Sequence, residues 1–275
     1  MENKQELFWL ACRSLNTEDI QFLLTNLKTS LNDYDSNGST LLCISCYYGR
    51  IEIINLLLNR EAIDVNKADL RSGRTPFYIA CEEGQIEVVK LLLNDGRIDV
   101  NKSDKDGWIP FSIACENGHI EIVELLLNEP RIDVNKENKY GQTPFLIACQ
   151  EENLEVVKLL LNDERVEINK PNSDGWTPLI TTSYNAKLEI MKYILASRKE
   201  VNFTAKDVDG KNAIDYGRRN IERERLGWES EEEYYTRKKI YVNIVQLLES
   251  LERNPNETKI KLRKQLGFAG ISLID

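Results

Sequence analysis

The chain has 275 residues, of which 41% are hydrophobic and 29% charged, an ordinary balance for a folded water-soluble protein. Its formal net charge of -9 argues against general nucleic-acid binding, which needs a basic face, and favours a partner with a basic or neutral surface. No apolar run approaches the ~20 residues that a membrane span needs, and the N-terminal apolar run is too short for a signal peptide. We therefore expect an intracellular, cytoplasmic protein without a membrane span.

In chain order, residues 1–35 come first and hold two apolar stretches, Leu7–Cys12 and Phe22–Leu24, with Thr17 placed to cap the second. From there on the sequence repeats itself. The glycines that open each repeat are separated by 35, 34, 34, 34 and 35 residues, at Gly38, Gly73, Gly107, Gly141, Gly175 and Gly210. A fixed period of this length predicts a stacked repeat array rather than one closed domain.

Each repeat predicts a turn, a short helix, a turn, a second helix and a loop. In the copy at residues 72–105, Thr75 offers a hydroxyl to the first unpaired amides and Pro76 suits the first helical position. Gly84 permits the left-handed turn that ends the short helix. The second helix, over residues 85–94, is apolar over more than one stripe, so we expect neighbours on two sides of it.

These motifs resemble the ankyrin repeat. The residues that carry the resemblance in one copy are Thr75-Pro76-Phe77, Ala80-Cys81, Gly84, Glu87-Val88-Val89, Leu91-Leu92-Leu93 and Asp99-Val100-Asn101. The resemblance implies an all-α fold, an α-solenoid of stacked helix-turn-helix units joined by β-hairpin-like loops. It also implies a monomeric protein-binding module and leaves the partner open, because function lies in the site and not in the scaffold.

We expect four segments along the chain. Residues 1–35 form a degenerate N-terminal capping repeat, and residues 36–208 form five ankyrin repeats. Residues 209–252 form a C-terminal capping repeat: Gly210 and Ile244 are 34 residues apart where Gly107 and Ile122 are 15 apart, so this repeat carries a 19-residue helical insertion. Residues 253–275 form a short basic helix and a tail, with Lys259, Lys261, Arg263 and Lys264 as one basic patch on the helix. The insertion is either a lengthened cap or a docking arm around Trp228.

Three features of the sequence could indicate a catalytic or metal-binding site, but a role in the core or in a turn explains each of them better. Cys46, Cys81, Cys115 and Cys149 share one repeat position, where helices ~8–10 Å apart cannot be bridged by a disulfide, so we expect small buried side chains. Cys43 and Cys46 have the spacing of half a metal or redox site, but no second ligand pair follows. His119, the single histidine, stands at a turn where a hydrogen bond explains it. We expect no catalytic residues, no metal and no cofactor.

The family's partners bind the concave face, which hairpin tips and the exposed side of the first helices form. Carried over position by position, this gives a candidate partner-binding set: Tyr47, Tyr48, Arg74, Glu82, Glu83, Trp108, Glu116, Asn117, Tyr140, Gln142, Gln150, Glu151, Trp176 and Tyr184. Aromatic side chains on exposed tips are typical of interface hot spots. The alternative is that these aromatic residues brace neighbouring hairpins.

Two functions remain open from the sequence. The first is a non-enzymatic intracellular scaffold or adaptor that binds a protein partner with a basic or aromatic surface. The alternative is the substrate-recognition subunit of a multi-protein enzyme complex, for example a ubiquitin ligase, that docks through the C-terminal insertion. Deletion of the insertion separates the two, because a simple scaffold would keep all its partners.

Overall fold

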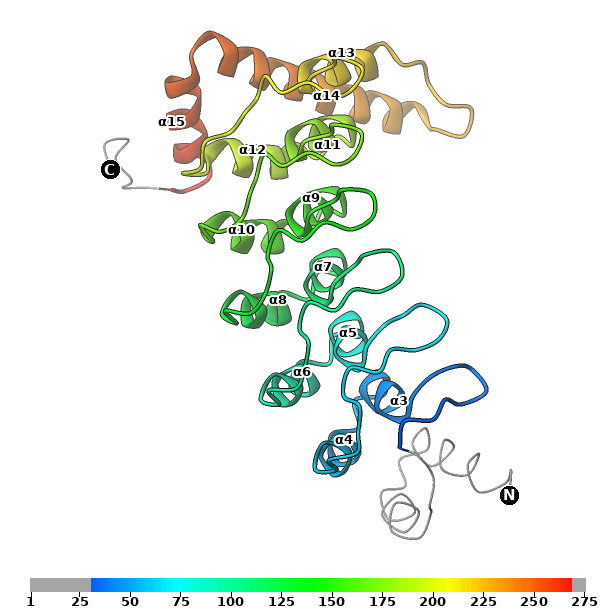
Figure 1. The fold of residues 1–275 in the computed structure, drawn as a ribbon. Helices are drawn as coiled ribbons and strands as arrows, with labels where there is room; N and C mark the ends of the chain where they lie inside the picture. Colours follow the sequence, from blue (N-terminus) through cyan, green and yellow to red (C-terminus); the bar gives the residue numbers. More distant parts are fainter. Residues whose placement is uncertain (1–30, 269–275) are drawn as a thin grey trace. The chain divides into compact units, whose positions relative to one another are not determined.

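A computed structural model describes residues 31–268, which divide into two compact units, residues 31–139 and residues 140–268. The N-terminal unit has three helix pairs (Figure 1): α3 Leu41–Tyr47 with α4 Ile51–Leu58, α5 Pro76–Glu82 with α6 Ile86–Leu93, and α7 Pro110–Glu116 with α8 Ile120–Leu127. The C-terminal unit contains α9 Pro144–Gln150, α10 Leu154–Asn162, α11 Pro178–Tyr184, α12 Leu188–Ala196, α13 Ala213–Glu222, α14 Glu231–Arg253 and α15 Pro255–Gln265.

The first helix of each pair begins where the sequence predicts. Thr75, Thr143 and Thr177 each accept a hydrogen bond on the side-chain oxygen from the backbone amide three residues on, and proline follows at the first helical position. This bond satisfies one of the amides that a helix start leaves without a partner. Helix α7 has Ile109 at this position instead of threonine. Here the Ser112 hydroxyl bonds the N-terminal end of the helix instead. It accepts a hydrogen bond from the Ile109 amide and donates one to the Ile109 carbonyl oxygen.

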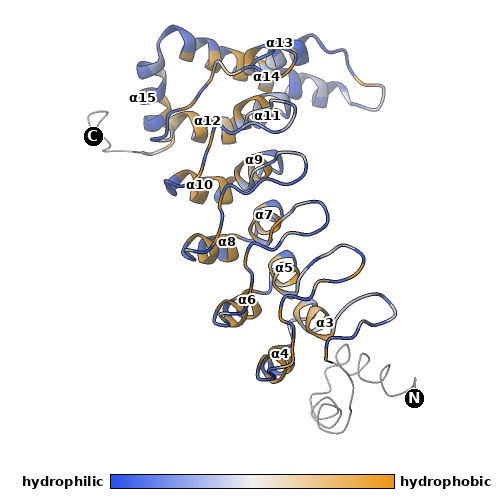
Figure 2. Cartoon of the chain, viewed as in Figure 1, coloured by the Kyte–Doolittle hydropathy of each residue, from blue (hydrophilic) through white to orange (hydrophobic). Residues whose placement is uncertain are grey.

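The core of each unit lies between helices. Val88, Val89 and Leu92 of α6 are fully buried, and α6 packs against both α5 and the second helices on either side, α4 and α8. The same three positions are buried in α4, α8 and α10. Figure 2 shows the apolar residues concentrated on the helices and polar residues along the loops. Burial from two sides explains why the apolar surface of these helices is wider than one stripe.

Successive repeats are also joined through their loops. A backbone hydrogen bond links neighbouring hairpin tips. Lys105 N donates to Ser72 O at 2.9 Å, and Ser173 N donates to Tyr140 O at 3.0 Å. At the opposite loop, Asn66 donates from Nδ2 to Arg97 O at 2.7 Å and accepts from Asp99 N at 2.8 Å. The two backbone groups that a loop would leave to water are therefore paired with the neighbouring repeat.

The turn between the two helices of a pair needs a left-handed residue. Gly84 takes this conformation with φ of +69°, and a Cβ atom there would stand 2.8 Å from the His119 ring. The ring occupies that space because His119 Nε2 lies 2.9 Å from the carbonyl oxygen of Glu82. The hydrogen bond expected of His119 is confirmed, and it joins two consecutive repeats.

The insertion lengthens the last helix pair. Helix α13 has 10 residues where the other first helices have 7, and α14 has 23. The segment between them, residues 223–230, has no helix and contains Gly227 and Trp228. Asn254 then caps α15 and Pro255 stands at its first helical position, as the sequence predicts.

The expected basic patch on this last helix needs correction. We expected Lys259, Lys261, Arg263 and Lys264 to form one patch, but the Arg263 guanidinium is turned inward. It donates to the carbonyl oxygens of Ala196 and Ser197, both at 2.9 Å. Leu262 is buried beside it, and α15 packs on α12 and α14.

Most of the expected N-terminal cap, residues 1–30, lies outside the described residues, as does Cys12. Within residues 31–268, no helix is long and apolar enough to cross a membrane. The same residues contain no cluster of three or more histidine, cysteine, aspartate or glutamate side chains that could hold a metal ion.

Candidate functional site

The candidate residues are organised in pairs that the sequence does not reveal. In each repeat, the residue after the opening glycine lies at the hairpin tip, and its counterpart eight positions later lies at the end of the first helix. We call these tip–helix pairs. Four of them belong to the candidate set: Arg74 and Glu82, Trp108 and Glu116, Gln142 and Gln150, and Trp176 and Tyr184.

The first tip–helix pair is an ion pair. Arg74 Nη1 lies 2.8 Å from Glu82 Oε1, and the guanidinium also stands over the Tyr78 ring, 5.4 Å from its centroid. Burial raises the pKa of the Glu82 carboxyl above its ordinary value, and the neighbouring Arg74 charge counteracts part of that effect. Asn117 of the next repeat donates to the Glu82 carbonyl at 2.9 Å. The end of α5 is therefore held by contacts from its own hairpin tip and from the next repeat.

Two other tip–helix pairs use different chemistry for the same geometry. Gln142 Nε2 donates to Gln150 Oε1 at 3.0 Å. The Trp176 and Tyr184 rings meet edge to face with centroids 4.8 Å apart. Charge, amide and aromatic pairs thus stand at equivalent places, and in these three repeats each pair fixes the tip to the helix end.

Trp176 is braced by more than its own repeat. Its ring centroid is 5.0 Å from that of Tyr216 on α13, and Tyr216 also meets Tyr184 at 5.7 Å. The Tyr216 hydroxyl donates to the buried Asp207 carboxylate. Burial and this bond to Asp207 raise the pKa of Tyr216 to about 12. The packing of Trp176 corresponds to the bracing alternative.

Exposed aromatic side chains stand at other candidate positions. Tyr47 and Tyr48, at the end of α3, expose 49% and 41% of their surface and pack edge to face with centroids 4.9 Å apart. Tyr140, on a hairpin tip of the C-terminal unit, is 58% exposed. Trp108 is half-buried, with its backbone amide bonded to Asp104 Oδ1 at 2.9 Å. Tyr47, Tyr48 and Tyr140 therefore expose a larger fraction of their surface than Trp108 or Trp176 does.

Acidic side chains accompany the tyrosines in the N-terminal unit. Glu83 is exposed at the end of α5, and Glu116 is half-buried at the end of α7. Helix α5 packs against both α3 and α7, so these helix ends follow one another along one side of the unit (Figure 1). We call this set the first-helix face: Tyr47, Tyr48, Glu82, Glu83, Glu116 and Asn117. In the C-terminal unit the equivalent exposed positions are Gln150 and Glu151.

The comparisons with known proteins identify the repeats. The family profile described as ankyrin repeats (3 copies) matches four overlapping stretches, residues 7–104, 63–138, 96–172 and 130–207. The chain belongs to the ankyrin repeat family. Its ankyrin repeats form an all-α solenoid, and such repeats are in general protein–protein interaction modules.

Solved ankyrin repeat structures support the fold. The crystal structure of the ankyrin repeat domain of Bcl-3, a unique member of the IkappaB protein family, matches with a TM-score of 0.69. The match covers 84% of this chain and 97% of that chain, at 19% sequence identity, so it shows the fold alone. No curated protein sequence matches this chain.

The ankyrin scaffold explains the cysteines. Cys43, Cys46, Cys81, Cys115 and Cys149 are buried and free of disulfides. Burial raises the pKa of the Cys43 thiol to about 11, and it raises the pKa values of Cys81, Cys115 and Cys149 further. Buried thiols that stay protonated are poor nucleophiles and poor metal ligands. The expected role of these side chains in the core is confirmed.

The sequence reasoning missed Tyr216 and Asp207. Asp207 occupies the turn position that Asp69 and Asp104 hold in earlier repeats, where the carboxylate accepts from backbone amides of the tip. That shared position was visible in the sequence. The contact with Tyr216 was not, because the aromatic cluster forms only when α13 packs against α11.

Proposed function

We propose that this ankyrin repeat protein is a non-enzymatic intracellular scaffold whose first-helix face binds a partner segment with basic and apolar side chains. Tyr47 and Tyr48 supply aromatic surface at one end of the face, and Glu83 and Glu116 supply negative charge at the other. The net charge of -9 adds a long-range attraction for a basic partner.

The observation that carries this proposal is the exposed Tyr47–Tyr48 pair beside acidic helix ends. An aromatic side chain that leaves about half of its surface exposed at the end of a helix contributes less to the core than a buried one does, and aromatic residues dominate the energetics of interfaces. Glu82 lies at the end of α5 and forms an ion pair with Arg74 of its own hairpin tip. We assign Glu82 to holding the face in place and assign the contact with a basic partner to the carboxylates of Glu83 and Glu116.

Affinity capture from lysate with identification by mass spectrometry, followed by direct affinity measurement, tests the proposal. Two variants remove the two halves of the face, Tyr47→Ala/Tyr48→Ala and Glu83→Lys/Glu116→Lys. Each variant should lower the affinity for the identified partner by about tenfold or more, because it removes one or two hot-spot contacts. The charge variant should also remove most of the salt dependence of binding.

A matched control carries the same change of charge elsewhere. Glu52→Lys/Glu121→Lys places two lysines on the exposed sides of the second helices α4 and α8. This control should leave the affinity within about twofold. Equal losses in both charge variants would mean that only the net charge matters, and an unchanged affinity in all variants would refute binding at the first-helix face.

A second candidate function rests on the loop between α13 and α14. Trp228 is 81% exposed there, on a loop that the buried Glu229 holds in place. Glu229 pairs with Arg237 at 2.8 Å and accepts from the Leu226 amide at 3.2 Å. An exposed tryptophan on a fixed loop favours a docking arm, which a recognition subunit of a larger enzyme complex would need.

Trp228→Ser tests the docking arm without touching its support. Loss of a co-purifying enzyme, with the first-helix partner retained, would favour the recognition subunit. Glu224→Gln is the control on the same loop, because Glu224 is exposed and should leave every partner in place. An unchanged set of partners in Trp228→Ser would leave the lengthened cap as the role of this hairpin.

A further inference from the structure

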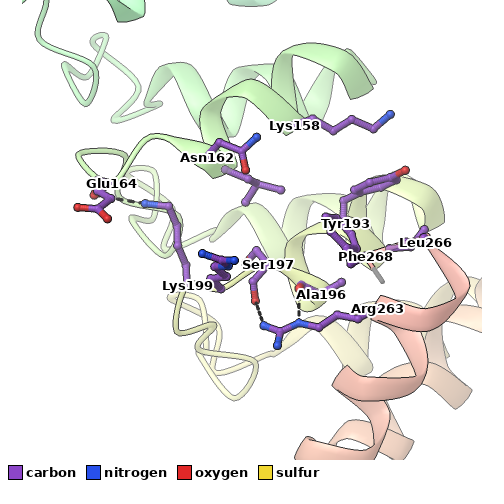
Figure 3. Close-up of a pocket in the computed structure, with 13 residues that line it drawn as sticks. Lys158, Asn162, Glu164, Tyr193, Ala196, Ser197, Lys199, Arg263, Leu266 and Phe268 are labelled. Atoms are coloured by element: carbon purple, nitrogen blue, oxygen red, sulfur yellow. Dashed lines mark hydrogen bonds between the residues drawn. The ribbon is translucent and has the colours of Figure 1, made fainter. Parts of the chain in front are cut away.

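A cavity of about 900 Å³ lies within the C-terminal unit, where the last residues of α10 and α12 face the end of α15 (Figure 3). Its volume falls in the ~300–1,000 Å³ range of ligand pockets. None of the candidate residues of the first-helix face lines it. The cavity therefore needs an explanation of its own.

The lining of the cavity is basic in an acidic protein. Lys158, Arg198, Lys199 and Arg263 line it, against one acidic residue, Glu164. The regular repeats show where this charge comes from. After α6, α8 and α10 stands an acid that binds an arginine two positions on: Asp95 with Arg97, Glu129 with Arg131 and Asp163 with Arg165.

The last regular repeat breaks this pattern. Ser197 follows α12 at the position of the acid, and Arg198 and Lys199 come directly after it. Lys199 reaches the carbonyl oxygens of Glu164 and Val166, at 3.3 and 2.9 Å, and Arg263 reaches those of Ala196 and Ser197. These bonds are to neutral carbonyl groups, and neither side chain forms an ion pair with a carboxylate among the described residues. Arg198 is exposed and has no ion pair among residues 31–268.

The other wall of the cavity is apolar. Tyr193 of α12 meets Phe268 edge to face with centroids 5.9 Å apart, and Lys158 stands 4.8 Å above the Tyr193 ring. Leu161 and Leu266 extend this wall from α10 and from the residue after α15. Figure 3 shows the Tyr193 and Phe268 rings on one side and Lys199 with Ser197 on the other. A ligand that fits both walls carries negative charge next to a bulky apolar group.

We propose that this cavity is a second protein-binding site, which accepts an acidic peptide segment containing a bulky apolar residue. The site is separate from the first-helix face and does not rest on the function proposed there. A peptide suits the site better than a free phosphate group does, because only the peptide can place an apolar side chain against the wall formed by Tyr193 and Phe268.

Selection from a displayed library of random octapeptides on the full-length chain tests this proposal. The same selection is run on Lys158→Gln/Arg198→Glu, which removes the positive charge of Lys158 and reverses that of Arg198, the two lining cations that do not bond to backbone carbonyl groups. Peptides enriched on the native chain and lost on this variant should carry aspartate or glutamate next to phenylalanine, leucine or isoleucine. As synthetic peptides, they should bind the variant about tenfold more weakly or worse.

Two control variants test whether a loss of peptide affinity comes from the cavity itself. One removes a lysine outside the cavity, and the other alters the apolar wall of the cavity. Lys90 holds the same place on α6 as Lys158 on α10, and each pairs with a glutamate three residues earlier. Lys90→Gln should therefore keep the peptide affinity within about twofold. Phe268→Ser should weaken the peptides with the largest apolar residues most.

Each remaining result overturns the proposal. Peptides lost on the variant that are basic or neutral would contradict the expected ligand, and so would the absence of any peptide that depends on Lys158 and Arg198. Residues 269–275, whose sequence is AGISLID, follow directly on Phe268 and have the same chemistry. Binding of acidic peptides by a chain ending at residue 268, but not by the full chain, would show that this segment occupies the cavity instead of a partner. Peptides that bind the native chain and the cavity variant equally do not use the cavity. The outcome for the cavity is therefore independent of the outcome for the first-helix face.

Discussion

The ring of Trp176 packs edge to face on the ring of Tyr184, with centroids 4.8 Å apart, and so fixes a hairpin tip to the end of the first helix of its own repeat. Tyr216 closes the cluster from the next helix pair at 5.0 Å. Aromatic pairs of this kind stabilise by ~0.5–1.5 kcal/mol each beyond the area they bury. Trp176 therefore stabilises the packing of the C-terminal unit.

Trp176→Ala should lower the free energy of unfolding by about 2–3 kcal/mol, because it removes two aromatic pairs and a half-buried side chain. Trp108→Ala is the matched variant at the same repeat position in the other unit. Urea unfolding followed by circular dichroism should show the larger loss for Trp176→Ala. A loss as large in Trp108→Ala would mean that the cluster with Tyr184 and Tyr216 adds nothing.

Asp207 predicts a specific response to acid. Burial alone would raise its pKa, but hydrogen bonds from the Tyr216 hydroxyl and from the Lys211 and Asp209 amides hold the pKa below the ordinary aspartate value. The stability that Asp207 contributes is therefore fully present above that ordinary value and is lost as the pH falls through the lower pKa of the folded state. Asp207→Asn should be less stable at neutral pH and should lose less stability in acid, as measured by thermal unfolding from pH 7 down to pH 2. Asp209→Asn, an exposed neighbour, is the control, and a parallel pH profile for all three proteins would contradict the prediction.

The threonine caps should each stabilise their repeat. Thr75→Ala and Thr143→Ala remove the hydroxyl that accepts from the amide at the start of α5 or α9, at a cost of about 1 kcal/mol each. At the start of α7 the equivalent cost should come from Ser112→Ala, because Ser112 and not residue 109 bonds the end of that helix. Ile109→Val, which keeps the side chain apolar, should cost no more than the loss of one methylene group. Hydrogen exchange of the first-turn amides would show whether each effect stays local.

The buried cysteines should be unreactive in the native protein. In a Cys12→Ser background, Cys43, Cys46, Cys81, Cys115 and Cys149 should remain unlabelled by iodoacetamide at pH 8, because burial excludes the reagent and raises the pKa of each thiol. All five should react in 8 M urea, with mass spectrometry counting the adducts. Rapid labelling of Cys43 or Cys46 under native conditions would instead support a redox role for that pair.

The sequence alone determined the repeat. The spacing of the glycines, the Thr-Pro starts and the apolar residues of the second helices are local signals, and each depends only on neighbours within about one helical turn or one repeat period. They placed the helix pairs, the caps at Thr75, Thr143 and Thr177, and the buried cysteine ladder. The longer last pair also followed from counting residues between Gly210 and Ile244.

The tertiary structure alone decided how candidate side chains are used. Trp108 and Trp176 share a repeat position, but only Trp176 has Tyr184 and Tyr216 within ring contact, because that contact depends on which residues the next helix pair brings to it. Likewise, Arg263 reads as one of four surface cations until α15 packs on α12 and turns its guanidinium onto the carbonyl groups of Ala196 and Ser197. A repeat sequence specifies contacts within one period, whereas these contacts join residues up to 67 positions apart, so only the packed structure could show them.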